Sequence, residues 1–427
     1  MSTSARLLAL DALVRIEDGA YAHVLLPAML RSSALGDRDR AFATDLVYGT
    51  LRAQRRLDDL VAHAAKRPMR RLDPPVRAAL RLGAYQLVHD VPQHAAVSET
   101  VDALGARSPR ARGFVNAVLR ALTRLGPPWP DPDTDAARLS YPDWLVERLA
   151  RDLGADDARD ALVAMNAPAT VVLRARDPDA VEHELRAAGA SVTRGELVRD
   201  ALVVRGIGDP AALAAVRDGR ATPQDQGSQA VVAVVGAQPG ERIADVAAAP
   251  GGKATAIAEM VGAEGSVAAL DVDAGRVRLV RDALDRLELE NLYPVLADGR
   301  AAPFRATAFD RVLLDAPCSG LGVLRRRPDA RWRLDERAID DLARLQRELL
   351  ASAADLVRPG GILVYSVCTL TRAETVDVDE WAVEHLNEFV AVTPPDEPWQ
   401  PLGRGALLLP QTAGTDGMFV VALQRRE

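Results

Sequence analysis

The stretch Asp245-Val-Ala-Ala-Ala-Pro-Gly-Gly-Lys253 is the most informative part of the chain. A short strand-like run over 241–245 precedes it, and a helix-like run over 253–260 follows it. Gly251 and Gly252 permit a sharp turn and a close approach to a ligand, because neither carries a Cβ atom. The N–H groups that open the following helix can bind a polar or anionic group. The sequence therefore predicts a nucleotide-type ligand loop at the carboxyl end of a first strand, as in doubly wound sheets.

The loop lacks the usual phosphate-binding patterns. A Walker loop needs glycine where Ala247 stands and serine or threonine where Ala254 follows the lysine, and no G-x-G-x-x-G fingerprint is present. S-adenosylmethionine carries no phosphate, so such a loop suits it better than a nucleoside phosphate. On this loop alone, an ordinary strand-to-helix turn remains an open alternative.

Length and composition indicate a soluble globular protein of two or three domains. The chain has 427 residues, 48% of them hydrophobic and 26% charged, and no apolar run approaches the roughly 18 residues of a membrane span. Two cysteines argue against a disulfide scaffold, and six scattered histidines show no pair at metal-ligand spacing. We expect a cytoplasmic, monomeric protein without a metal site, a membrane segment or a signal peptide.

Residues 1–130 have only helical periodicity and a basic charge balance. They contain 19 Lys and Arg against 12 Asp and Glu, a balance of +7, so the remainder of the chain, whose total is −7, carries −14. A basic part beside an acidic part suggests a nucleic-acid-binding module, although a solvated surface rich in arginine would give the same count. Apolar stripes predict helices over 7–14, 42–51, 74–87, 95–106 and 111–124.

Three stretches in this part carry a resemblance to a known family. They are Asp39-Arg-Ala-Phe42, His94-Ala-Ala-Val-Ser-Glu-Thr100 and Gly113-Phe-Val-Asn-Ala-Val-Leu-Arg120. They resemble the NusB family of helical RNA-binding domains. The resemblance implies that residues 1–130 form an RNA-facing helical domain.

A proline-rich stretch marks the next boundary. Gly126-Pro-Pro-Trp-Pro-Asp-Pro-Asp133 cannot continue a helix. Residues 138–218 then show strand-like runs at 170–174 and 201–205 around a helix at 179–188, which predicts a small α/β subdomain. Residues 219–427 form the third predicted domain.

From residue 220 onward, strands alternate with helices, which predicts a doubly wound, Rossmann-like α/β core with helices on both faces of a parallel sheet. After 241–245, the expected strands are 266–271, 292–298, 309–315 and 361–366, with a helix at 337–357 before the last. Four strands end in an acid, at Asp245, Asp271, Asp298 and Asp315. Each acid alone is more often a helix cap, but four beside a glycine loop indicate a ligand edge.

The two cysteines fall just after the last two of these strands. Cys318 lies in Asp-Ala-Pro-Cys-Ser and Cys368 in Tyr-Ser-Val-Cys-Thr. A buried cysteine is usually structural, but two at the proposed cofactor edge indicate chemistry, where the strand-end dipoles favour a lowered thiol pKa. A thiolate that adds to carbon 6 of cytosine activates carbon 5 toward a methyl sulfonium. An acid at Asp315 would hydrogen-bond the cytosine amino group and ring nitrogen 3.

The same residues resemble the RNA cytosine-5 methyltransferase family. The matching stretches are 245–253, Asp298-Gly-Arg300, Asp315-Ala-Pro-Cys-Ser-Gly320, Arg325-Arg-Arg-Pro-Asp329 with Trp332, Leu345-Gln346, and Val364-Tyr-Ser-Val-Cys-Thr369. With the NusB-like part, the resemblance covers nearly the full length. It implies 5-methylation of cytosine in small-subunit ribosomal RNA with S-adenosylmethionine as cofactor.

The resemblance also implies roles for single residues. Cys368 would be the nucleophile, Cys318 would assist product release, and Asp315 would lie near the base as well as the cofactor. The other expected cofactor contacts are Ala247, Ala248, Ala249, Pro250, Gly251, Gly252, Lys253, Asp271 and Asp298. Two positions depart from the family: Ala247, where cysteine is frequent, and Val367, where threonine is common.

Alternatives remain open at this point. DNA cytosine-5 enzymes use the Pro-Cys cysteine as nucleophile, but a second cysteine on the next strand favours the RNA class. A catalytically silent RNA-binding or ribosome-assembly factor could keep the same fold, and another RNA could be the substrate. Arg325, Arg326, Arg327 and Trp332 lie just beyond the Cys318 loop, and we expect them to bind RNA, although a solvated loop would look the same.

Overall fold

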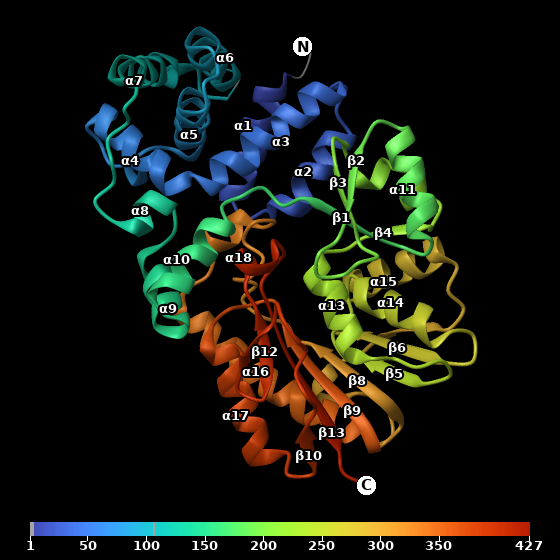
Figure 1. The fold of residues 1–427 in the computed structure, drawn as a ribbon. Helices are drawn as coiled ribbons and strands as arrows, with labels where there is room; N and C mark the ends of the chain where they lie inside the picture. Colours follow the sequence, from blue (N-terminus) through green and yellow to red (C-terminus); the bar gives the residue numbers. More distant parts are fainter. Residues whose placement is uncertain (1–3, 106) are drawn as a thin grey trace. The chain divides into compact units, whose positions relative to one another are not determined.

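The computed structural model describes residues 4–105 and 107–427, which separate into two compact units (Figure 1). The helical unit runs to Glu147 and also contains the separate segment Arg326–Arg333. The α/β unit contains Arg148–Arg325 and Leu334–Glu427. The chain therefore leaves the α/β unit after Arg325 to supply eight residues of the helical unit, and then returns.

The helical unit is a bundle whose core is lined by leucine, valine and alanine. The helices predicted over residues 7–14, 42–51, 74–87 and 111–124 are confirmed; residue 106, the expected end of another, lies outside the described residues. Close approach of α3 and α5 requires Gly49, because a Cβ atom there would lie 2.1 Å from the Tyr85 ring. The elements are α1 (Ala5–Glu17), α2 (Ala22–Arg31), α3 (Asp37–Arg52), α4 (Gln54–Ala65), η1 (Met69–Arg71), α5 (Pro74–Val88), α6 (Gln93–Gly105), η2 (Pro109–Ala111), α7 (Arg112–Leu125), α8 (Asp135–Leu139) and, in the separate segment, η5 (Pro328–Trp332).

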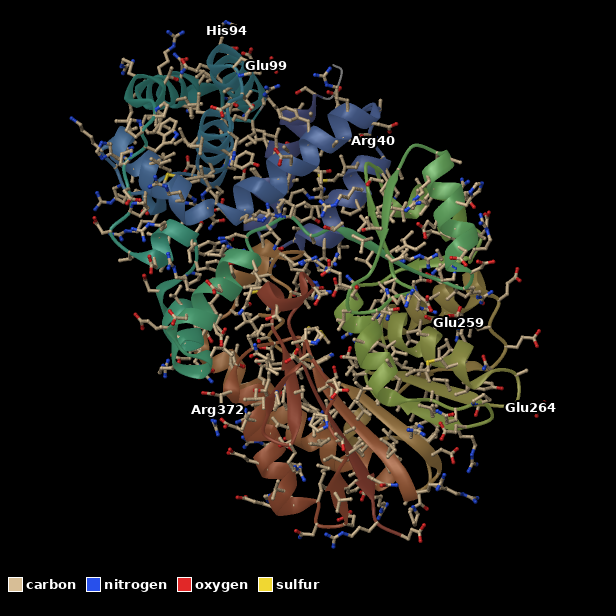
Figure 2. The ribbon with its side chains drawn as sticks, viewed as in Figure 1. Arg40, His94, Glu99, Glu259, Glu264 and Arg372 are labelled. Carbon is tan, nitrogen blue, oxygen red and sulfur yellow. The ribbon has the colours of Figure 1, made fainter. Side chains whose placement is uncertain are left out.

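A small antiparallel sheet opens the α/β unit. Its strand order is β2-β3-β1-β4, and the two strands and the helix predicted from the sequence are β1, β3 and α11. Glu259 of the glycine-loop helix, labelled in Figure 2, forms ion pairs with Arg174 and Arg176 and so ties this sheet to the larger one. The elements are α9 (Asp143–Leu153), which contains the unit boundary, α10 (Ala155–Ala164), β1 (Val171–Ala175), α11 (Pro178–Ala187), β2 (Ser191–Arg194), β3 (Leu202–Arg205), η3 (Pro210–Ala212), α12 (Ala214–Arg217) and β4 (Ala221–Pro223).

The larger sheet confirms the Rossmann-like core. Its parallel strands follow the order β7-β6-β5-β8-β9. The strand order therefore reverses between β5 and β8: β6 and β7 are added on one side of β5, and β8 and β9 on the other. Because crossovers between parallel strands are right-handed as a rule, the two before the reversal and the one after it place helices on opposite faces of the sheet. The elements are α13 (Gln226–Val235), β5 (Arg242–Asp245), α14 (Gly252–Val261), β6 (Ser266–Asp271), α15 (Ala274–Leu287), β7 (Leu292–Leu296), η4 (Gly299–Ala301), β8 (Phe309–Asp315), α16 (Glu336–Leu356) and β9 (Val357–Val367).

The C-terminal part adds antiparallel strands that the sequence did not reveal. β13 pairs with β9 over six residues and carries β12, β11 and β10 beside it. The elements are η6 (Arg372–Glu374), α17 (Val376–His385), β10 (Phe389–Ala391), β11 (Gln400–Leu402), β12 (Gly405–Leu408), α18 (Pro410–Ala413) and β13 (Met418–Arg425). Within the described residues, no helix combines the length and the apolar character that crossing a membrane requires.

Candidate active site

The glycine loop lies at the carboxyl end of β5, at the point where the strand order reverses. Its backbone is held by bonds from Ala248 N–H to Leu270 O (2.7 Å) and from Gly251 N–H to Ala248 O (2.8 Å). Gly251 has φ +104°, a conformation that favours glycine, and it caps the start of α14. The crevice outside the strand ends at such a reversal is the usual ligand position in open α/β sheets. The structure therefore places the loop where the sequence predicted a cofactor.

The four strand-end acids differ in how far their carboxyl groups are already satisfied. Asp245 is 0% exposed, and neither of its carboxyl oxygens has a partner within hydrogen-bond geometry. Asp271 is also buried, accepts a bond from Asp273 N–H (3.1 Å) and lies 3.3 Å from the Arg276 guanidinium. Val272, the residue after Asp271, is 68% exposed and offers an apolar surface beside it. This combination fits a ligand with both polar and flat apolar parts.

Asp298 is placed differently from the other acids, because β7 ends at Leu296 and the predicted strand end at Asp298 is wrong. Its carboxylate accepts bonds from the backbone N–H of Arg300 (2.9 Å) and from the same residue's guanidinium, and these bonds lower the pKa of Asp298. It caps η4 at the end of the β7 loop. Its expected cofactor contact stays a prediction.

The pKa of Asp245 is raised to about 7, chiefly by burial and in addition by the nearby Asp315 carboxylate, while the Lys253 ammonium partly opposes both effects. A buried carboxyl group without hydrogen bonds is costly to ionise. Asp245 is therefore only partly ionised near neutral pH, and a cation or a hydrogen-bond donor that approaches it favours the charged form.

Lys253 joins the glycine loop to the Pro-Cys loop. Its Nζ atom lies 2.7 Å from Asp315 Oδ2, and both side chains are largely shielded from solvent. Burial alone would lower the pKa of Lys253, but the Asp315 carboxylate outweighs that effect and the pKa lies above its ordinary value. Lys253 thus keeps its proton, and Asp315 has a second carboxyl oxygen that can accept a further hydrogen bond. The sequence indicated each residue separately but not this ion pair.

The two cysteines meet across the ends of β8 and β9. Cys318 Sγ lies 3.3 Å from Cys368 Sγ, and no disulfide joins the two. The hydrogen bond with Cys368, together with burial, raises the pKa of Cys318 well above its usual value. The sequence-based expectation of a lowered pKa at both strand ends is therefore wrong for Cys318. Contact with a second sulfur and loss of solvent outweigh any dipole effect there.

A polar cluster beneath the cysteines escaped the sequence analysis. Glu374, the last residue of η6, is fully buried and hydrogen-bonds residues of both cysteine loops. Gln346 of α16 donates to Pro317 O (2.9 Å) and to Glu374, and Tyr365 of β9 donates to Gln346 Oε1 (3.1 Å). In the sequence, Gln346 stands out only as part of the resemblance to the methyltransferase family, and no local pattern predicts that Glu374 is buried.

The expected RNA-binding arginines occupy different environments. Arg325 is 9% exposed, donates to Gly414 O (2.7 Å) and lies 3.3 Å from the buried Asp416. Arg326 is partly buried, and Arg327 is exposed. Whether they bind RNA stays a prediction, and Arg327 is the member that offers an exposed side chain.

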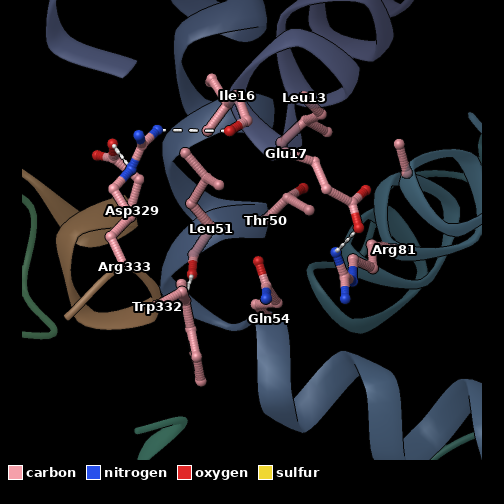
Figure 3. A pocket seen from close by; sticks show the side chains of 11 residues that line it. Leu13, Ile16, Glu17, Thr50, Leu51, Gln54, Arg81, Asp329, Trp332 and Arg333 are labelled. Atoms are coloured by element: carbon pink, nitrogen blue, oxygen red, sulfur yellow. Dashed lines mark hydrogen bonds and ion pairs between the residues drawn. The ribbon is translucent and has the colours of Figure 1, made fainter. Parts of the chain in front are cut away.

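Trp332 belongs to the helical unit. Its indole Nε1 donates to Leu51 O (3.2 Å), and the ring lines a cavity of about 200 Å³ whose walls come from α1, α3, α4, α5 and the 326–333 segment (Figure 3). Arg331 is fully buried with its guanidinium 3.9 Å from the Tyr141 ring centroid. Arg333 donates to carbonyl groups at the end of α1, one of which is Ile16 O in Figure 3. These contacts anchor the segment within the helical unit, and RNA binding by Trp332 stays a prediction.

The structure thus brings most of the predicted site residues to one sheet edge. The glycine loop, Asp271, Asp315 and both cysteines lie at the carboxyl ends of β5, β6, β8 and β9. Among the described residues, no group of three or more His, Cys, Asp and Glu is arranged to hold a metal ion.

Comparisons with known proteins agree with this geometry. Residues 232–424 match the family model described as 16S rRNA methyltransferase RsmB/F, residues 3–124 match the NusB family, and residues 141–209 match a RsmF/B-like ferredoxin-like domain. A protein of Mycobacterium tuberculosis is 39% identical over 95% of this chain and 93% of its own length. The probable ribosomal RNA small subunit methyltransferase B of Bacillus subtilis is 34% identical over 99% of both chains. The crystal structure of PH0851 has a TM-score of 0.85 at 28% identity and covers the whole of both chains.

Proposed function

The chain belongs to the RsmB/F family of 16S rRNA methyltransferases, and from this membership we propose that it methylates carbon 5 of a cytosine in small-subunit ribosomal RNA. The reaction proceeds through a covalent bond between a cysteine and carbon 6 of the base. The NusB-like helical unit contributes RNA binding, and the enzyme works in the cytoplasm as a monomer.

S-adenosylmethionine is the cofactor, and the residues at the carboxyl edge fit it. The glycine loop and the unsatisfied Asp245 carboxyl would hold its polar amino acid part. The buried Asp271 would bind the ribose hydroxyls, and the exposed Val272 would offer an apolar surface to the adenine. When bound, it supplies an electrophilic methyl group on a sulfonium, which carbon 5 of the activated cytosine takes up.

Cys368 is the nucleophile in this mechanism. Its thiolate adds to carbon 6, and the ring electrons move to carbon 5, which becomes nucleophilic. Asp315, positioned by Lys253 at 2.7 Å, accepts a hydrogen bond from the cytosine amino group and orients the ring. The target base leaves its stack to enter this site.

Cys318 acts in the second half of the reaction. The hydrogen bond with Cys368 is the largest cause of the raised pKa of Cys318, and this bond is lost when Cys368 becomes a thioether. Cys318 then ionises more readily, at the stage when the proton on carbon 5 must leave. Removal of that proton restores the carbon 5–carbon 6 double bond and expels Cys368 as a thiolate.

The observation that carries the proposal is the contact of the two thiols, 3.3 Å apart, beside the Lys253–Asp315 ion pair. A silent RNA-binding or assembly factor would not need this arrangement, and a related RNA could take the place of 16S rRNA as substrate. Bisulfite sequencing of total RNA from a deletion strain separates these possibilities. We expect one cytosine in 16S rRNA to lose its methyl group and regain it with the wild-type gene but not with Cys368→Ala. Unchanged methylation in the deletion strain contradicts the enzyme proposal, and a lost mark in another RNA identifies that substrate instead.

A further inference from the structure

Glu374 is a buried carboxylate that accepts hydrogen bonds from five donors. The residue is 0% exposed. Its Oε1 atom accepts from Ser319 N–H (2.8 Å) and from Gln346 Nε2 (3.1 Å). Its Oε2 atom accepts from the hydroxyls of Ser319 (2.6 Å), Thr369 (3.0 Å) and Thr371 (2.8 Å). Such a group is costly to bury and is retained only when it is fully satisfied.

Three of the five donors belong to the residues that directly follow the two cysteines. Ser319 follows Cys318, and Thr369 follows Cys368. The two hydroxyls also contact each other at 2.8 Å. One carboxylate therefore fixes two loops that are 50 residues apart in the sequence and that have no covalent link in the reduced enzyme.

We propose that Glu374 is a positioning residue that holds the sulfur atoms of Cys318 and Cys368 at contact distance. It touches neither cofactor nor base, and it acts through Ser319 and Thr369. The inference rests on the proposed function for its catalytic meaning, because the paired thiols matter only if both take part in the reaction. The geometric part, that Glu374 sets the distance between the sulfurs, stands independently of any substrate.

The donor set predicts which substitutions the site tolerates. Both donors to Oε1 are N–H groups, which cannot reverse their role, whereas all three donors to Oε2 are hydroxyls, which can accept as well as donate. A glutamine with its carbonyl on the Oε1 side and its NH₂ group on the Oε2 side therefore keeps both loops connected. An alanine removes every hydrogen bond that runs through residue 374 and leaves only the direct contact of the Ser319 and Thr369 hydroxyls between these two residues. Glu374→Gln and Glu374→Ala thus form a matched pair that separates the hydrogen-bond pattern from the charge.

The first measurement needs no RNA or cofactor. Diamide, an azo oxidant that takes up two hydrogen atoms, converts neighbouring thiols to a disulfide, for which the sulfurs must close from 3.3 Å to about 2.05 Å. We expect Glu374→Ala to slow Cys318–Cys368 cross-linking at least about tenfold, because the thiols lose part of their effective concentration. Glu374→Gln should cross-link within about threefold of the wild type. Equal rates in wild type and Glu374→Ala overturn the proposal.

The second measurement is single-turnover methylation of RNA at saturating cofactor. A misplacement of about 1 Å costs on the order of a hundredfold in rate. We therefore expect Glu374→Ala to lower the single-turnover rate constant by about a hundredfold and Glu374→Gln to lower it by less than about tenfold. The cofactor Kd should stay unchanged in both variants. If the wild type transfers no methyl group to RNA, the proposed function fails while the cross-linking result still decides the role of Glu374.

The control is Asp379→Asn, another buried carboxylate of the α/β unit, which pairs with Arg404 at 2.8 Å. It reports what loss of a buried acid does to stability alone. We expect Asp379→Asn to lower the unfolding temperature without changing the cross-linking rate. If it slows cross-linking as much as Glu374→Ala does, the role of Glu374 is only structural and the proposal is wrong. If Glu374→Ala does not fold, Thr369→Val with Thr371→Val removes two of the connections, and an unchanged cross-linking rate there overturns the proposal equally.

Discussion

Replacing Asp245 by asparagine should remove a pH dependence from the stability of the α/β unit. The folded protein raises the pKa of Asp245 from 3.8 to about 7, chiefly through burial, so the native state binds this proton more tightly than the unfolded chain does. The stabilisation is therefore complete below about pH 4 and is lost as pH rises through 7. Each pKa unit corresponds to about 1.4 kcal/mol. Between pH 5 and the folded pKa of about 7, the free energy of unfolding falls by about 1.4 kcal/mol per pH unit, and above pH 7 this group causes no further change. Between pH 5 and pH 8 the wild type should therefore lose about 3 kcal/mol of its free energy of unfolding through Asp245.

Differential scanning calorimetry at pH 5 and pH 8 measures the effect. A loss of about 3 kcal/mol corresponds to a fall of about 6 °C in Tm for a unit of this size. The Tm of Asp245→Asn should therefore fall by about 6 °C less than that of the wild type between pH 5 and pH 8. Saturating S-adenosylmethionine should also reduce the decrease in the wild type, because a cation beside the carboxyl group favours its charged form. Equal changes in Tm for wild type and Asp245→Asn would refute the assignment of a raised pKa to this residue.

Two further predictions concern catalysis and RNA capture. Cys318→Ala should methylate RNA once and then remain covalently bound to it, which a denaturing gel detects. Cys368→Ala should form no covalent complex and should still bind cofactor. The reverse pattern would identify Cys318 as the nucleophile. Arg326→Ala with Arg327→Ala should weaken RNA binding and flatten its salt dependence by about one unit of slope per lost phosphate contact. Arg325 is left unchanged in that test because its pairing with a buried acid makes its loss destabilising, and equal affinity and slope in a filter-binding titration contradict the prediction.

Much of the core fold could be predicted because its signals are local. Each parallel strand is a short apolar run, and those that end at Asp245, Asp271 and Asp315 are confirmed at the same terminal residue. The glycine loop predicts the first strand-to-helix turn, and the alternation of strands with helices predicts that the strands of the sheet are parallel. Once that order is known, all strand-end residues must meet at one edge. This reasoning is sufficient to bring the acids and both cysteines together.

What the sequence could not reveal depends on packing between distant segments. β13 pairs with β9 because the chain returns to the sheet after α17. No local sequence pattern predicts which edge of a sheet such a C-terminal strand will join. Glu374 resembles any surface glutamate in the sequence, since burial of an acid is decided by its five donors from three separate segments. The raised pKa of Cys318 likewise follows from a sulfur 50 positions away.

The arginine cluster after the Cys318 loop shows why charge patterns alone do not locate an RNA surface. A run of arginines around a tryptophan has the composition of a nucleic-acid contact, yet the same side chains can satisfy buried carbonyl groups and acids. Arg325 pairs with a buried acid in the α/β unit, whereas Arg331 is enclosed against Tyr141 in the helical unit. A guanidinium without such partners gains by binding phosphate, whereas one that already has them must first give them up. We therefore predict that RNA capture by this segment depends on Arg327, its exposed member, more than on the number of arginines.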